Sequence, residues 1–182
     1  MNKFVLGILF IALTIGACNN PNKKEIGEVD ALIEKANETE KVLLSIDTSK
    51  VFGTKRLLEK DLAEFTKIGD TLTKEEAFEA ADYFGSKKKF RRLFTRYPKF
   101  MLDIEKSKNQ LSNLRQDLEN DLIKKENYST YYADEHAVLK DLDVQINKLV
   151  TGIDVVVDKY ETDRPKLLEL MEVLKQKAAT NE

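Results

Sequence analysis

The chain has 182 residues, of which 34% are charged, and its 30 lysines and arginines nearly balance its 32 aspartates and glutamates. Glycine is scarce, tryptophan is absent, and Pro98 and Pro165 are the only prolines after Pro21. This composition favours long helices over sheets and allows one domain with its own core. With one cysteine and one histidine, His136, the chain cannot form an intramolecular disulfide or a Cys/His zinc site.

The amino-terminal segment has the features of an export signal. Lys3 supplies a positive start, and the apolar run from Phe4 to Leu13 is shorter than the ~20 residues that span a bilayer. The run leads to Ile15-Gly16-Ala17-Cys18, which resembles the lipobox of bacterial lipoproteins. The resemblance implies a signal peptide over residues 1–17 and a diacylglyceryl-modified Cys18 as the mature terminus. An ordinary secretory signal followed by an unrelated cysteine is the alternative.

The segment after this cysteine predicts where the protein is held. Residues 18–25 are polar and contain Pro21, so we expect a flexible tether of at most ~25 Å. Asn19 differs from the Asp that resembles an inner-membrane retention signal in enteric bacteria. Residues 19–24 also lack the acidic run associated with surface export in some Bacteroidota. The expected location is therefore the cell envelope, at the outer membrane and facing the periplasm.

Residues 26–182 are expected to form one helical domain. Apolar residues recur at helical spacing from Ile26 to a first helix end near Ser45, and a second helix carries Leu58, Leu62, Phe65 and Ile68 before Gly69. Asp47 lies in the turn between them, a position that favours N-cap residues. Thr73 and Glu76 have capping-box spacing, which predicts a third helix from Lys74 to Phe84 that ends at Gly85.

Two long apolar stripes dominate the rest of the chain. One spans about residues 86–126, and the other runs from Leu139 past Leu149 to Leu174. Their three-four alternation continues through Pro98 and Pro165, and proline usually kinks a helix. Each stripe is therefore either one kinked helix or two helices stacked end to end. The stripes predict an all-α, elongated three- or four-helix bundle with coiled-coil-like heptads and two proline-kinked long helices. The long helices should pair across a turn at residues 127–129, with Leu149 in the core.

The candidate chemical groups are few. The chain has one histidine, one cysteine and no glycine-rich phosphate loop. We therefore expect no catalytic site, cofactor or metal. His136 is expected to be a polar residue near a helix start, and Tyr128, Tyr131 and Tyr132 should pack at a bundle end, with ligand binding as the alternative. Asp70-Thr71-Leu72 resembles the motif at which exported proteins of Bacteroidota are O-glycosylated. A helix-capping loop is the other interpretation of Thr71.

One stretch is strongly basic. No acidic residue lies between Asp82 and Asp103, while this interval contains seven cations: Lys87, Lys88, Lys89, Arg91, Arg92, Arg96 and Lys99. Apolar residues at helical spacing should dock this stretch on the bundle and leave the cations outward. The cations then either pair with acids of other helices or bind an anionic surface, such as lipid head groups, an acidic glycan or an acidic protein.

These features lead to two functional hypotheses. The first is a non-enzymatic, lipid-anchored envelope protein whose bundle is a spacer or interaction module for a protein or an envelope polymer. Nucleic acid is not an expected partner, because an exported protein rarely meets it. The second is a small-ligand carrier or an enzyme with a pocket between the helices. Ser107 and Asp163 are the polar residues that interrupt the two long stripes and could face such a pocket.

Overall fold

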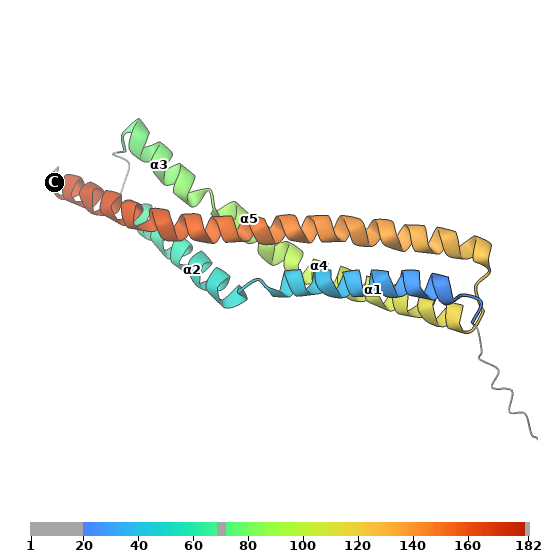
Figure 1. Ribbon diagram of the computed structural model, residues 1–182. Helices are drawn as coiled ribbons and strands as arrows, with labels where there is room; N and C mark the ends of the chain where they lie inside the picture. The colour runs from blue at the N-terminus through green and yellow to red at the C-terminus, as the bar shows by residue number, and fades with distance from the viewer. Residues whose placement is uncertain (1–19, 69–71, 181–182) are drawn as a thin grey trace, which may run out of the picture.

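The computed structural model describes residues 20–68 and 72–180 and shows an all-α, elongated bundle, as predicted. Helices account for 89% of this described part, which contains no strands. The five helices are α1 (Lys23–Leu44), α2 (Thr48–Phe65), α3 (Lys74–Phe84), α4 (Lys87–Glu119) and α5 (Lys125–Thr180). Figure 1 shows α5 running the full length of the rod, with α1 alongside its first half and α2 and α3 inclined to its second half.

Both prolines lie inside continuous helices, Pro98 in α4 and Pro165 in α5. The long helices are bent at 38° and 13° but are not broken. Proline removes one backbone hydrogen bond and crowds the preceding turn, which explains why a helix bends at such a residue. The apolar stripe continues on both sides of each proline, so burial holds the two halves of each helix together.

The turn between the long helices lies earlier than predicted. Helix α4 ends at Glu119, and α5 begins at Lys125, so residues 127–129 are helical and the predicted turn is wrong. Asp121 has a left-handed φ of 55°. Its N–H donates to the Leu118 carbonyl, and the Leu122 N–H donates to the Asp117 carbonyl over 2.8 Å. These two bonds form a Schellman motif, which ends a helix by satisfying its last carbonyls.

The core has two parts that meet along the long helices. Near the α4–α5 turn, α1 packs between α4 and α5 around residues such as Val29, Ala36, Leu111 and Leu139. Further along the rod, α2 and α3 replace α1, and a larger cluster forms around Leu58, Phe90, Ile146, Tyr160 and Met171, among others. The chain therefore forms one elongated bundle in which α4 and α5 pack against α1 at one end and against α2 and α3 at the other.

The predicted stripes are confirmed for most positions and wrong at a few. In α4, Tyr97 is only partly buried, and in α5, Leu149 and Leu170 are half-buried at the core edge. Met171 takes the fully buried position next to Leu170. A straight helix turns 100° per residue and drifts against a strict heptad, so the buried line moves to a neighbouring residue.

The caps of the short helices follow the sequence prediction. The Asp47 side chain accepts a hydrogen bond from the Lys50 backbone N–H at the start of α2. Thr73 and Glu76 form a complete capping box at α3, which spans the predicted residues and ends at Gly85. Each of these contacts lies within four residues, which explains why sequence alone predicts them.

The amino-terminal end of α1 is fastened to the carboxyl-terminal end of α4. The Asn22 amide donates to the Leu118 carbonyl at 2.9 Å and to Asp121 at 3.2 Å. Helix α1 begins at Lys23, so three residues of the segment expected as a tether are helical, and Glu25 is buried. Cys18 and the rest of residues 1–19 lie outside the described residues. The start of α1 is therefore held next to the α4–α5 turn by these hydrogen bonds.

Candidate docking site

The basic stretch forms the first three turns of α4, next to α2 and the end of α3. Its apolar residues dock as predicted: Phe90 and Leu93 are buried, and Phe94 and Tyr97 pack half-buried against the core. All seven predicted cations are exposed. The start of α4 therefore presents a surface with positive charge only, formed by Lys87, Lys88, Lys89, Arg91, Arg92, Arg96 and Lys99.

These cations have no carboxylate partner within the described part of the chain. None of the seven takes part in an ion pair there, whereas several acids of α2 and α3 are paired with other residues. Glu59 pairs with Lys55, Asp82 pairs with Lys159, and Glu76 pairs with Lys177. The geometry therefore does not favour the alternative in which the basic stretch is an internal salt-bridge face.

An apolar groove lies directly beside this basic surface. Phe52 of α2, Phe84 of α3 and Phe94 of α4 line it, and its volume is about 780 Å³. The Phe52 and Phe94 rings are tilted against each other with centroids 4.4 Å apart, and Lys55 Nζ lies 5.8 Å from the Phe94 centroid. Lys87, Lys88 and Arg91 stand on the α4 side of the groove. We call this feature the aromatic groove.

The remaining cations are divided between two places. A smaller hollow of about 220 Å³ shares Lys88 and Arg91 with the aromatic groove and continues to Arg92 and Arg96. Lys89 and Lys99 line neither hollow. The structure thus brings five of the seven predicted cations around two adjoining depressions and leaves two on the open surface.

The α2 side of the groove was not predicted from the sequence. The predicted apolar stripe of α2 consists of Leu58, Leu62, Phe65 and Ile68, but only Leu58 of these is fully buried. The buried line is Val51, Thr54, Leu58 and Asp61, which turns Phe52 outward to 58% exposure. The position of Phe52 next to an apolar stripe is only a weak sequence signal for an exposed aromatic residue. Whether such a residue faces the core or the solvent depends on how α2 is rotated in the bundle.

A buried polar cluster lies on the same face of α2 as Val51 and Leu58. Asp61 is 2% exposed and accepts hydrogen bonds from Tyr83 (3.0 Å), Tyr160 (3.1 Å) and both Nε (2.9 Å) and Nη2 (3.1 Å) of Arg164. These donors come from α3 and α5, so the cluster ties three helices together. Burial disfavours the Asp61 carboxylate, but the bonds from Arg164 and the two tyrosines outweigh it and lower the pKa of Asp61.

The same cluster affects its tyrosines in the opposite direction. Burial, with the neighbouring tyrosine and the Asp61 carboxylate, raises the pKa of Tyr83 far above its usual value. Burial also raises the pKa of Tyr160. Both phenols therefore stay protonated and remain donors, which suits a structural cluster and gives neither the character of a general base.

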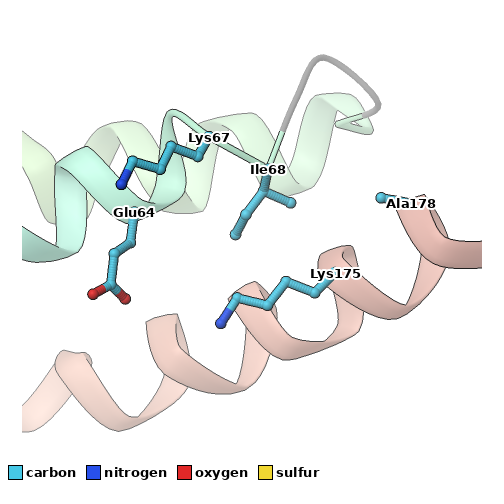
Figure 2. Close-up of a pocket in the computed structure, with 5 residues that line it drawn as sticks. All are labelled: Glu64, Lys67, Ile68, Lys175 and Ala178. Carbon is cyan, nitrogen blue, oxygen red and sulfur yellow. The ribbon is translucent and has the colours of Figure 1, made fainter.

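Other hollows offer less chemistry. One hollow, of about 380 Å³, lies between the ends of α2 and α5. Figure 2 shows Ile68 pointing into it towards α5, with Glu64 and Lys67 on one side and Ala178 on the other. Another, of about 180 Å³ between α3 and α5, is lined by Glu79, Asp82 and Asp163. Asp82 and Asp163 both pair with Lys159, and the Asp82 side chain is 73% exposed, so this hollow is a solvated surface rather than a buried carboxylate site.

The remaining predicted residues lie apart from the aromatic groove. His136 is exposed and stacks on Tyr132, and Tyr128 is buried at the start of α5, where its hydroxyl donates to Glu28 over 2.7 Å. Ser107 is 1% exposed, and its hydroxyl has no described hydrogen-bond partner. Thr71 lies outside the described residues.

Within 20–68 and 72–180, no helix is long and apolar enough to cross a membrane. Over the same ranges, no three His, Cys, Asp or Glu side chains gather as a metal site.

No protein family model, curated protein or solved structure matches this chain.

Proposed function

We propose that this protein is a non-enzymatic, lipid-anchored component of the bacterial cell envelope whose helical rod presents a basic docking surface for an anionic partner. One observation carries the proposal: exposed cations without a described carboxylate partner line one wall of an aromatic groove at a distance from the chain's entry point. These cations are clustered in one stretch, although the chain as a whole has 30 basic and 32 acidic residues. An unpaired cluster beside exposed aromatic surface is typical of an interaction site.

The anchor rests on the sequence of residues 1–18. The Ile15-Gly16-Ala17-Cys18 segment supports lipidation of Cys18, and two acyl chains give stable anchoring where one gives marginal binding. Cys18 is four residues before Asn22, a chain length of at most ~14 Å. The anchored end of the rod is then the α4–α5 turn, and the outer membrane facing the periplasm is the proposed location.

Helix length separates the anchor from the docking surface. Helix α4 has 33 residues, and the cations occupy its start whereas Asn22 binds its end. At 1.5 Å per residue, this separation is ~40 Å. Figure 1 shows the corresponding arrangement, with the start of α1 and the α4–α5 turn together at one end. An upright rod therefore holds the basic surface away from the anchoring membrane, which favours a protein or an envelope polymer over that membrane's own head groups.

A small-ligand carrier is the second candidate. The aromatic groove has a volume within the 300–1,000 Å³ range of ligand sites and an aromatic lining. It lies on the surface between α2 and α4 rather than inside the bundle, and ligand pockets bury most of their occupant. This geometry supports an interaction surface better than a carrier or an enzyme pocket.

The proposal is tested by binding of the protein to polyglutamate and to anionic and neutral vesicles at several salt concentrations. We expect binding to polyglutamate that weakens with salt, because exposed charges are screened. Charge reversal at Lys88, Arg91, Arg92 and Arg96 should abolish binding without lowering thermal stability. If no anionic probe binds, and the reversed variant instead melts at a lower temperature, these cations stabilise the fold and the proposal is wrong.

A further inference from the structure

We propose that the aromatic groove binds an acidic amphipathic helix of a partner protein, whose apolar face covers Phe52 and Phe94 and whose carboxylates meet Lys87, Lys88 and Arg91. This inference rests on the proposed function and names the partner's chemistry. Two features carry it: the shape of the groove and the arrangement of charge along one of its walls.

The groove has the dimensions of a helix site. Its walls are residues 52–59 of α2 and residues 84–95 at the end of α3 and the start of α4. Eight residues of helix extend ~12 Å, which corresponds to about two turns of a bound helix. Helix-in-groove recognition uses apolar residues at positions i, i+3 or i+4 and i+7 over such a length. Between two helical walls, a third helix completes the local packing that the rest of the bundle already uses.

Exposed aromatic surface supplies the apolar contact. The Phe52 ring is 58% exposed although it touches the Phe94 ring, and Phe94 is itself only partly buried. Both rings belong to helices whose other sides are fixed in the core by Val51, Leu58, Phe90 and Leu93. The floor is therefore rigid before binding, so an incoming apolar side chain gains contact without reorganising the protein.

Charge along the groove selects an acidic partner. The carboxylate among its lining residues is Glu59, which is paired with Lys55 at 2.8 Å. Lys87, Lys88 and Arg91 have no described acidic neighbour and lie on the opposite wall from Glu59. A helix with acids on one flank of its apolar face finds complementary charge there, whereas a basic helix is repelled.

Two other anionic occupants fit the geometry less well. A membrane surface would meet the protruding cations but would leave the recessed Phe84 and Phe94 rings uncovered, and the groove lies ~40 Å from the proposed anchor. A single fatty acid or similar amphiphile would leave much of its surface in water, because the groove is open along its length. Both remain outcomes of the test rather than parts of the proposal.

The test uses the full protein as purified from cells, held in neutral-lipid nanodiscs, and a fluorescent helical peptide of about 14 residues. The peptide carries leucines at i, i+3, i+4 and i+7 and glutamates on the flanks of that face. A scrambled peptide of the same composition controls for charge, and palmitate, anionic vesicles and polyglutamate represent the other occupants. We expect saturable binding of the amphipathic peptide and roughly tenfold weaker binding of the scrambled one.

Matched variants locate the contact. Charge reversal of Lys87, Lys88 and Arg91 should weaken peptide binding roughly tenfold or more, because three paired charges become repulsive. The control reverses Lys89, Arg92 and Lys99, which changes net charge equally but leaves the groove intact, and should lower affinity by less than about threefold.

A second pair of variants tests the aromatic contact. Phe52→Ser should weaken binding of the amphipathic peptide by roughly threefold to tenfold. Phe78→Ser should not, because Phe78 is equally exposed, at 65%, but lies outside the groove on α3. Melting curves of the two charge-reversed variants and of Phe78→Ser should match that of the unaltered protein, because each altered side chain is exposed. Phe52→Ser should remain folded and melt slightly lower, because it also removes the contact with the Phe94 ring.

The possible results separate this inference from the broader proposal. Equal binding of the scrambled peptide, or equal losses in the two charge-reversed variants, would show a general anionic surface and overturn the groove inference alone. Binding of palmitate or vesicles without peptide binding would also overturn it. If polyglutamate and vesicles fail to bind as well, the proposed function falls together with the inference.

Discussion

The buried Asp61–Arg164 pair gives the most quantitative prediction about stability. Asp61→Asn keeps the size of the side chain but removes the charge that Arg164 meets through Nε and Nη2. The new amide also places a donor at one of the two carboxylate oxygen positions, both of which now accept hydrogen bonds. Up to four hydrogen bonds to an almost fully buried carboxylate are therefore weakened or lost.

The expected magnitude follows from the partial exposure of Arg164. Removing one partner of a fully buried pair costs about 3–5 kcal/mol, because the other charge is left uncompensated. The Arg164 side chain is 30% exposed, so water can solvate part of its charge and reduce this cost. We expect a loss of about 3 kcal/mol in the free energy of unfolding. For a protein of this length, that loss corresponds to a melting temperature lower by about 6–12 °C.

The assay is urea unfolding followed by circular dichroism, with Asp30→Asn as the matched control. Asp30 also meets an arginine Nε, that of Arg115 at 2.6 Å, but both side chains are well exposed. Exposed pairs contribute little, so the control should destabilise the protein far less. Equal losses in the two variants would refute the reasoning, because burial would then not be what makes the Asp61 pair matter.

The pH dependence of stability is a second test of the Asp61 cluster, because the lowered pKa of Asp61 predicts in which direction stability changes with pH. The pKa of Asp61 is lowered in the folded protein, so its stabilising effect is present above the pKa of an unfolded aspartate, about 3.9. That effect is lost as the pH falls through the lower, folded pKa. The unaltered protein should therefore lose its stability advantage over Asp61→Asn below about pH 4. A constant difference between the two proteins down to pH 2 would contradict the lowered pKa.

Three further predictions concern other parts of the chain. Cys18→Ala should abolish uptake of labelled palmitate and leave the signal peptide uncleaved, as seen by mass spectrometry; an unaltered protein that takes up no label would contradict lipidation. Ile146→Ala should cost about 3 kcal/mol in urea unfolding because Ile146 is fully buried, whereas Leu149→Ala should cost about half as much, and equal costs would mean that the assigned burial is wrong. Asp121→Gly should raise stability by about 0.5 kcal/mol, because glycine adopts the left-handed φ of 55° without strain. A loss in that experiment would show that the Asn22–Asp121 hydrogen bond outweighs the backbone strain.

The sequence by itself determined the elements and their local ends. Helix α3 begins and ends at the predicted residues because Thr73, Glu76 and Gly85 act through contacts within one turn. The apolar periodicity likewise predicted that the buried stripes continue through Pro98 and Pro165, and only the structure shows that each is one bent helix rather than two stacked helices. The α4–α5 turn was misplaced because Asp121 adopts a conformation that glycine usually marks, so its signal is weak.

Only the tertiary structure decided which side chains meet at the docking site. Phe52 and Phe94 are far apart in the chain, and their contact depends on how α2 is rotated against α4. In that rotation Val51, Thr54, Leu58 and Asp61 are buried, and the partner of Asp61, Arg164, lies 103 residues away. Helical periodicity describes one helix at a time and treats Asp61 as solvent-facing. Because Asp61 is instead buried on the same face as Val51 and Leu58, Phe52 lies on the exposed side of α2, against Phe94.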